Sequence, residues 1–138
     1  MQNPLLGLLI GLVFTALIQS SSASVGVLQA LAASGAIGLD SAIYVIYGQN
    51  IGTCVTAIMA SAGTTKTAKR TATVHLLFNV IGATLFTCIT LLTPFTSLIK
   101  SISPNNVMMQ ISIVHIIFNI VTTSILLPLS NYLVKLAC

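Results

Sequence analysis

Charge is almost absent from this sequence. Among 138 residues there are five lysines and arginines and one acidic residue, Asp40, while 56% of the residues are hydrophobic. Because roughly a quarter of the residues of a soluble domain are charged, we exclude that class and expect a protein that lies in a lipid bilayer. No basic patch is interleaved with aromatic residues, so nucleic acid is not expected as a partner.

The residue pairs that enzymes need are also missing. One acidic residue cannot form a pair of carboxylates, and no nucleophile stands beside a base. The three cysteines, Cys54, Cys88 and Cys138, are too widely spaced for a redox or metal motif. We therefore expect no enzyme activity, no cofactor and no metal centre.

Three segments are long and apolar enough to be predicted as membrane-spanning helices. Each has roughly the 20 residues that a helix needs to cross the hydrocarbon core of a bilayer. They cover residues 40–63, 71–93 and 107–127, and residues 128–138 follow as a C-terminal tail. The sequence therefore predicts an all-α integral membrane protein, with a single membrane domain over residues 1–138.

The positive charges indicate the orientation of these spans. Three of the five basic residues lie in the linker "TTKTAKR" between the first two spans, and linkers rich in Lys and Arg stay in the cytoplasm. The loop of residues 66–70 is therefore expected in the cytoplasm, and the linker of residues 94–106 on the outside. The expected location is a plasma membrane of the bacterial type.

The first forty residues do not fit a simple span. Residues 4–18 and 25–39 are each 15 residues long, and at about 1.5 Å of rise per residue each reaches only about 22 Å, short of the roughly 30 Å core. One interpretation is a re-entrant helical hairpin over residues 4–39, with the serine-rich segment at its tip. The alternative is one continuous helix from Pro4 to about Leu31, whose serines bond to its own carbonyls. We favour the hairpin, because non-helical backbone at membrane depth is tolerated where it lines a cavity.

The stretch "QSSSAS" places five polar side chains in this apolar region: Gln19, Ser20, Ser21, Ser22 and Ser24. If the helix breaks here, the hydroxyls and the unpaired N–H groups of the next helix offer hydrogen-bond donors to an anion. The alternative is a contact between helices, since small residues permit close approach in a bilayer. We expect a binding role, because polar groups within the membrane are costly unless they are used.

A second polar motif, "GQNIGTCVT", lies in the middle of the first long span. Its two glycines weaken a helix, so this span is expected to be discontinuous. The oxygens of Asn50, Thr53 and Thr56, next to Gln49, are then suited to a hard monovalent cation, as in the broken helices of secondary transporters. The alternative is a kinked helix whose glycines lie at a packing contact.

The motif "VHLLFN" returns forty residues later as "VHIIFN". It places a histidine and an asparagine four residues apart on each of two spans: His75 with Asn79, and His115 with Asn119. We expect these side chains to form hydrogen bonds between helices beside the site, with a proton relay as the alternative. Too few ligands surround them for a zinc site.

Four motifs in this order resemble the type II sodium/phosphate cotransporter family. They are "QSSSA" (19–23), "GQNIGT" (48–53), the basic "AKR" (68–70) and "HLLFN" (75–79). In that family the motifs occur twice, in two repeats of inverted topology that meet around a site for sodium and inorganic phosphate. This chain resembles the second repeat, so the resemblance implies one repeat of an inverted-repeat transporter.

The resemblance also implies roles for individual residues. The serines of the first motif match the segment that binds substrate, and sodium is assigned to Gln19, Ser22, Asn50 and Thr53. The chain has a single copy of "QSSS" where the family has two. We therefore expect it to work as a repeat unit with a second copy of itself or a second repeat.

The expected function is sodium-coupled transport of inorganic phosphate, with sodium as the coupling ion. A lack of carboxylates near the motifs fits an anionic substrate, because a fixed negative charge would repel it. Two alternatives stay open: a transporter or channel for another oxyanion, and a membrane assembly subunit that transports nothing.

Overall fold

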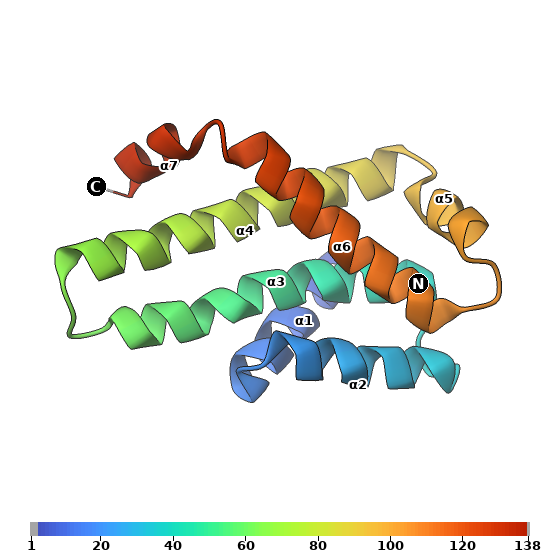
Figure 1. The fold of residues 1–138 in the computed structure, drawn as a ribbon. Coiled ribbons are helices and arrows are strands. Elements are labelled where there is room, and N and C mark those ends of the chain that lie inside the picture. Colours follow the sequence, from blue (N-terminus) through green and yellow to red (C-terminus); the bar gives the residue numbers. More distant parts are fainter. Residues whose placement is uncertain (1–2, 138) are drawn as a thin grey trace.

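The computed structural model describes residues 3–137, and in this part of the chain it is helical with no strand (Figure 1). The helices are α1 Pro4–Ile18, α2 Ser21–Ala33, α3 Leu39–Ser61, α4 Lys66–Leu92, α5 Phe95–Ile102, α6 Val107–Leu126 and α7 Ser130–Leu136. Three of them, α3, α4 and α6, are long and apolar enough to cross a membrane. The all-α fold class predicted from the sequence is confirmed.

The helix of the first segment breaks at Gln19. This residue adopts the left-handed conformation, with φ 58°, and its backbone N–H donates to the Thr15 carbonyl. Ser20 is extended, and its hydroxyl accepts a hydrogen bond from the Ala23 N–H at 3.3 Å, which caps helix α2. Two short helices, rather than one continuous helix, therefore flank the serines.

Helix α3 is continuous from Leu39 to Ser61, so the predicted break in residues 40–63 is wrong. The reason is the position of its glycines against α1. A Cβ on Gly48 would overlap the backbone of Leu8, and one on Gly52 would lie 2.6 Å from the Leu12 carbonyl oxygen. The glycines lie at a packing contact, where they bring two helix backbones together without breaking either.

The same contacts give the direction of the helices. Leu8 lies beside Gly48 and Thr15 beside Gly52, so α1 and α3 run in parallel. Helix α2 returns in the opposite direction, in contact with α1, α3 and α6, and α1 with α2 forms a helical hairpin (Figure 1). Asn3 and Ile37 line one cavity at the open end of the hairpin. The two ends of the hairpin are therefore on the same side of the bundle.

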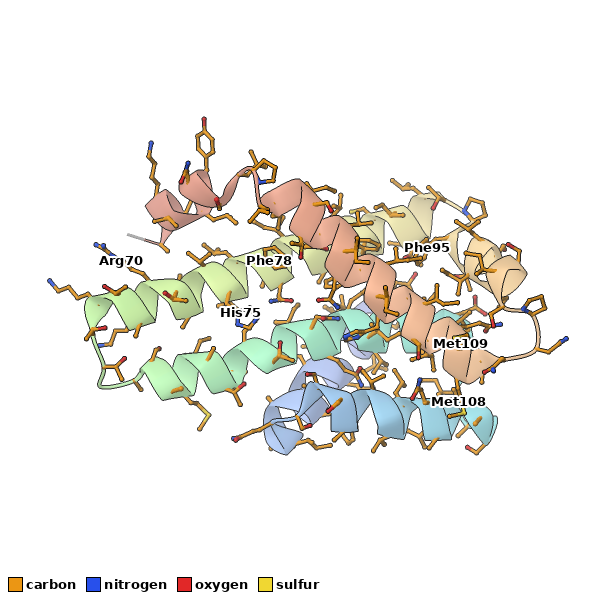
Figure 2. The ribbon with its side chains drawn as sticks, viewed as in Figure 1. Arg70, His75, Phe78, Phe95, Met108 and Met109 are labelled. Atoms are coloured by element: carbon orange, nitrogen blue, oxygen red, sulfur yellow. The ribbon has the colours of Figure 1, made fainter. Side chains whose placement is uncertain are left out.

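Residues 66–70, predicted as a loop, are the first residues of helix α4. The hydroxyl of Thr65 accepts a hydrogen bond from the Ala68 N–H at 3.3 Å, so the helix is capped before the basic residues begin. Lysine, alanine and arginine are good helix formers, which favours this early start. Figure 2 shows Arg70 near this end of α4, and its side chain is exposed.

Three aromatic rings hold the long helices together. Tyr47 on α3, Phe86 on α4 and Phe118 on α6 are buried, with ring centroids 5.1 to 5.8 Å apart. The Tyr47 hydroxyl and the Thr90 hydroxyl are 2.8 Å apart, so the polar atom of the tyrosine is satisfied within the core. This cluster fixes α6 across α3 and α4.

Helix α5 lies in the linker of residues 94–106, where the sequence analysis predicted no helix. It follows Pro94, buries Phe95 and Ile99 on one face, and extends Lys100 from the other. The Lys100 Nζ is 3.2 Å from the Asp40 Oδ2 at the start of α3, and both side chains are partly exposed. The one acidic residue of the chain is thus paired at the end of α3 opposite to Ser61.

Replacing Asp40 with asparagine should change the free energy of unfolding by no more than about 1 kcal/mol, because exposed ion pairs contribute little. The measurement is thermal unfolding of both proteins at low and high salt, and any small difference should shrink as salt rises. A loss of several kcal/mol that persists in high salt would show that this pair stabilises the fold far more than its exposure suggests.

Candidate functional site

The serine-rich segment forms the tip of the hairpin. Gln19, Ser21 and Ser22 are exposed at this tip, and the Ser20 hydroxyl is 3.4 Å from the Ser22 hydroxyl. Ser21 and Ser22 also lie in the first turn of α2, where backbone N–H groups have no acceptor within the helix. Hydroxyls and amides at the positive end of a helix are the donors that bind an oxyanion.

The tip lies within the length of a long helix. Thr15 packs beside Gly52 and the two helices run in parallel, so the tip, four residues after Thr15, is about level with Thr56. Helix α3 continues beyond this level to Ser61. Polar atoms of the tip therefore lie beside the body of an apolar helix and not beyond its end.

The second motif lies on the buried side of α3. Gln49 and Asn50 are 1% and 5% exposed. Thr53 and Thr56 are half-buried, and each hydroxyl donates to a carbonyl of its own helix at 2.6 Å. The two amides therefore lie inside the protein, and the two threonines at its margin.

Two hydrogen bonds connect the amides of Gln49 and Asn50 with neighbouring helices. The Gln49 Nε2 donates to the Ser24 carbonyl at 3.0 Å, which joins the two polar motifs. The Asn119 Nδ2 donates to the Asn50 Oδ1 at 3.5 Å, a long contact, and to its own helix at the His115 carbonyl at 2.8 Å. These bonds form one polar seam across α2, α3 and α6, which consists of Ser24, Gln49, Asn50 and Asn119.

Other predicted site residues are not joined to this seam. Within residues 3–137, no hydrogen bond connects Gln19 or Ser22 with Asn50 or Thr53. The four residues assigned to sodium are divided between the exposed tip and the side chains of α3. Their joint role in binding an ion stays a prediction.

The two histidines differ in burial: His75 is exposed, and His115 is half-buried. Asn79 is buried and its Nδ2 donates to the His75 carbonyl at 3.0 Å, as Asn119 does to His115. The His75 side chain is exposed and lines an open cavity of about 410 Å³ between the end of α3 and the start of α4 (Figure 2). In the described part of the chain, no three His, Cys, Asp or Glu side chains are grouped as a metal site would require.

The sequence model of the Na+/Pi-cotransporter family matches residues 1–103, from the hairpin through helix α5. The match covers most of the chain, including both polar motifs. The chain belongs to the Na+/Pi-cotransporter family. With three apolar helices of spanning length, it is an integral membrane protein.

Curated relatives extend the match. The chain is 42% identical to the uncharacterized protein YqeW of Bacillus subtilis over 129 residues, which are 94% of this chain and 41% of YqeW. It is 41% identical to sodium-dependent phosphate transport protein 2A of Rattus norvegicus over 85 residues, 57% of this chain and 13% of that protein. It is 46% identical to sodium-dependent phosphate transport protein 2B of Homo sapiens over 56 residues, 41% of this chain and 8% of that protein. The chain thus spans less than half the length of these relatives, and no solved structure gives a significant match.

Two residues of this Na+/Pi-cotransporter chain were not identified from the sequence. Thr15 is 1% exposed in the last turn of α1. Cys54 is fully buried, and its thiol reaches the His75 carbonyl on α4 at 3.5 Å. Thr15 stands four residues before Gln19, a helical spacing that puts it on the same face of α1 as the start of the tip. This spacing is the feature of the sequence from which Thr15 could have been identified.

Proposed function

We propose that this chain takes part in sodium-coupled transport of inorganic phosphate, as one repeat unit of a transporter. The observation that carries this proposal is the helix break at Gln19 and Ser20, which leaves hydroxyls and amides exposed beside the body of a spanning helix. Membership of the Na+/Pi-cotransporter family supports the same function.

Electrostatics favours phosphate at the tip. The sole acidic residue, Asp40, lies at the opposite end of α3 in its ion pair with Lys100. No carboxylate therefore repels an anion bound by Ser20, Ser21 and Ser22. Bound sodium supplies the compensating positive charge, so each ion lowers the cost of placing the other in a low-dielectric site and the two bind cooperatively.

A second repeat, or a second copy of this chain, completes the site in this proposal. Gln19, Ser21 and Ser22 are exposed in the isolated chain, so only one side of a bound anion is covered. The chain accounts for 41% of the length of YqeW, which leaves room there for another repeat. Sodium lies between the tip and the partner, near Gln19 and Ser22, with Asn50 and Thr53 on α3.

The proposal includes a membrane arrangement. In it the hairpin enters and leaves the bilayer on one side, which is supported by the position of its two ends together at the side of Asn3 and Ile37. The start of α4, with its three basic residues, faces the cytoplasm, and the membrane is a bacterial-type plasma membrane.

Phosphate uptake into proteoliposomes should require an inward sodium gradient. Radiolabelled phosphate is expected to accumulate with sodium outside and to stay at the level of protein-free liposomes when choline replaces sodium. Arsenate should compete, because it has the same shape and charge as phosphate. Uptake that is indifferent to sodium would contradict the coupling, and equal uptake of sulfate would indicate a general oxyanion transporter.

A further inference from the structure

Hydroxyl groups in this protein usually bond to their own helix. Examples are Thr53, Thr56, Thr73, Thr84, Ser112 and Ser124, each of which donates to a carbonyl three or four residues earlier. Four hydroxyls differ, because they are buried and have no hydrogen-bond partner among the described residues: those of Thr15, Ser24, Thr87 and Thr122. Two of them, Thr15 and Ser24, belong to the hairpin and are 1% and 0% exposed. Buried hydroxyls without a partner are costly and call for an explanation.

Thr15 and Ser24 occupy matching positions on the two arms of the hairpin. Thr15 lies four residues before Gln19, and Ser24 lies four residues after Ser20. Because the helices run in opposite directions from the tip, the two positions are opposite each other. Both are also next to Gln49: Thr15 packs beside Gly52, one turn further along α3, and the Ser24 carbonyl accepts from the Gln49 Nε2.

Gln49 contributes a third buried oxygen. Only its Nε2 can donate to the Ser24 carbonyl, so this hydrogen bond fixes the orientation of the amide. The Gln49 Oε1 is then an acceptor, and it too has no partner in the described part of the chain. Neither the Thr15 nor the Ser24 hydroxyl forms a hydrogen bond with it, and a species bound between them would satisfy all three oxygens.

We propose that Thr15, Ser24 and Gln49 bind one monovalent cation, sodium, between helices α1, α2 and α3. This site lies behind the serine tip and is separate from the tip residues Gln19 and Ser22. Its role in transport rests on the proposed function, to which it adds a second sodium ion inside the hairpin, besides the sodium between the tip and the partner. A cation held there ties both arms of the hairpin to α3 and fixes the tip that binds the anion.

The chemistry of the three oxygens selects this ligand. Two hydroxyls and an amide oxygen are hard, neutral ligands, which suit a monovalent cation. A divalent ion prefers carboxylates, and Asp40 is at the far end of α3. Thr15 lies at the negative end of α1 and Ser24 at the positive end of α2, so the two helix dipoles oppose each other here and the oxygen ligands decide the preference. A water molecule would also satisfy the oxygens, but it would not make the stability of the protein depend on whether the salt is sodium or choline chloride. This dependence distinguishes bound sodium from bound water.

The test is sodium-dependent thermal stability of the full chain in detergent, without phosphate. Sodium chloride is titrated against choline chloride at constant ionic strength. Because Cys88 is exposed, Cys88 and Cys138 are replaced with alanine, and unfolding is followed with a dye that reacts with the buried Cys54 thiol. Sodium, but not choline, should raise the Tm of the wild-type protein. Thr15→Val and Ser24→Ala should each weaken the apparent sodium affinity by about tenfold or more, since each loses one contact to a charged group.

Three matched variants make the result specific. Thr15→Ser keeps the hydroxyl and should keep the sodium response. Thr122→Val removes an equally buried hydroxyl without a partner, which faces Gly82 on α4, and should also keep it. Ser124→Ala removes an exposed hydroxyl on α6 that donates to its own helix, and should also leave the sodium response intact.

Two results would overturn the proposal. One is an equal Tm in sodium and choline, which would assign the three oxygens to a buried water. The other is a wild-type sodium response in both Thr15→Val and Ser24→Ala, which would place any sodium elsewhere. Because no phosphate and no gradient are used, sodium binding is measured whether or not the protein transports phosphate, so failure of the two proposals can be distinguished.

Discussion

Replacing Ser20, Ser21 and Ser22 together with alanine is expected to abolish sodium-dependent phosphate uptake while the helices stay folded. The three hydroxyls are the side-chain donors of the tip, and a hydrogen bond to a charged group contributes about 1.5–3 kcal/mol. Loss of several such bonds reduces binding by orders of magnitude. The cost to the fold is small, because the Ser20 cap contributes only about 1 kcal/mol.

The measurement is the initial rate of phosphate uptake in proteoliposomes, with circular dichroism and Tm as checks of folding. Ser22→Ala alone leaves the Ser20 cap in place and should already reduce uptake strongly. Ser124→Ala is the matched control: this serine is exposed on α6, its hydroxyl donates to the Ile120 carbonyl at 2.8 Å, and its loss should leave uptake unchanged. A triple variant that transports at the wild-type rate would favour an assembly role for the motif.

Replacing Gly48 with alanine is expected to destabilise the protein strongly. The new Cβ would overlap the backbone of Leu8, which cannot rotate away as the end of a side chain can. Helix α1 must then move off α3, and overpacking of this kind costs about 1–3 kcal/mol or more. The gain in helix propensity, about 1 kcal/mol, does not offset this loss.

Gly26→Ala is the matched control for Gly48→Ala. A Cβ on Gly26, inside α2, has no atom within 4 Å, so the same chemical change should be neutral or stabilise by about 0.5–1 kcal/mol. Thermal unfolding of both variants in detergent gives the comparison. If Gly48→Ala is as stable as Gly26→Ala, then α1 and α3 do not pack as closely as the structure indicates.

The sequence predicted the helix break of the hairpin but not the continuity of α3, and the reason is physical. A run of serines in an apolar segment predicts a helix break from the local sequence alone, without reference to any other helix. The two glycines in α3, Gly48 and Gly52, can indicate either a weak helix or a close contact between helices. Which of the two applies depends on the helix that packs against them. That partner, α1, is some forty residues away in the sequence and becomes apparent only in the packed structure.

The sequence predicted which residues belong to the candidate site better than it predicted how those residues are arranged. Gln49 and Asn50 were identified because amides are rare in apolar spans, but the structure directs Gln49 to Ser24 and Asn50 toward Asn119. Thr15 looks ordinary in the sequence, since a lone threonine in a membrane helix normally bonds to its own backbone. Only its burial and the lack of a partner among the described residues set it apart.

The central claim is that sodium and phosphate bind at the serine tip of the hairpin. It is tested most directly with a cysteine at Ala23, beside the serines, in a protein whose native cysteines are replaced. Ala23 is exposed, so Ala23→Cys should react with a membrane-impermeant maleimide. Sodium with phosphate should slow this reaction severalfold, and should not affect Ala33→Cys, which is exposed at the other end of α2. Equal rates for Ala23→Cys with and without the two ions would contradict the account.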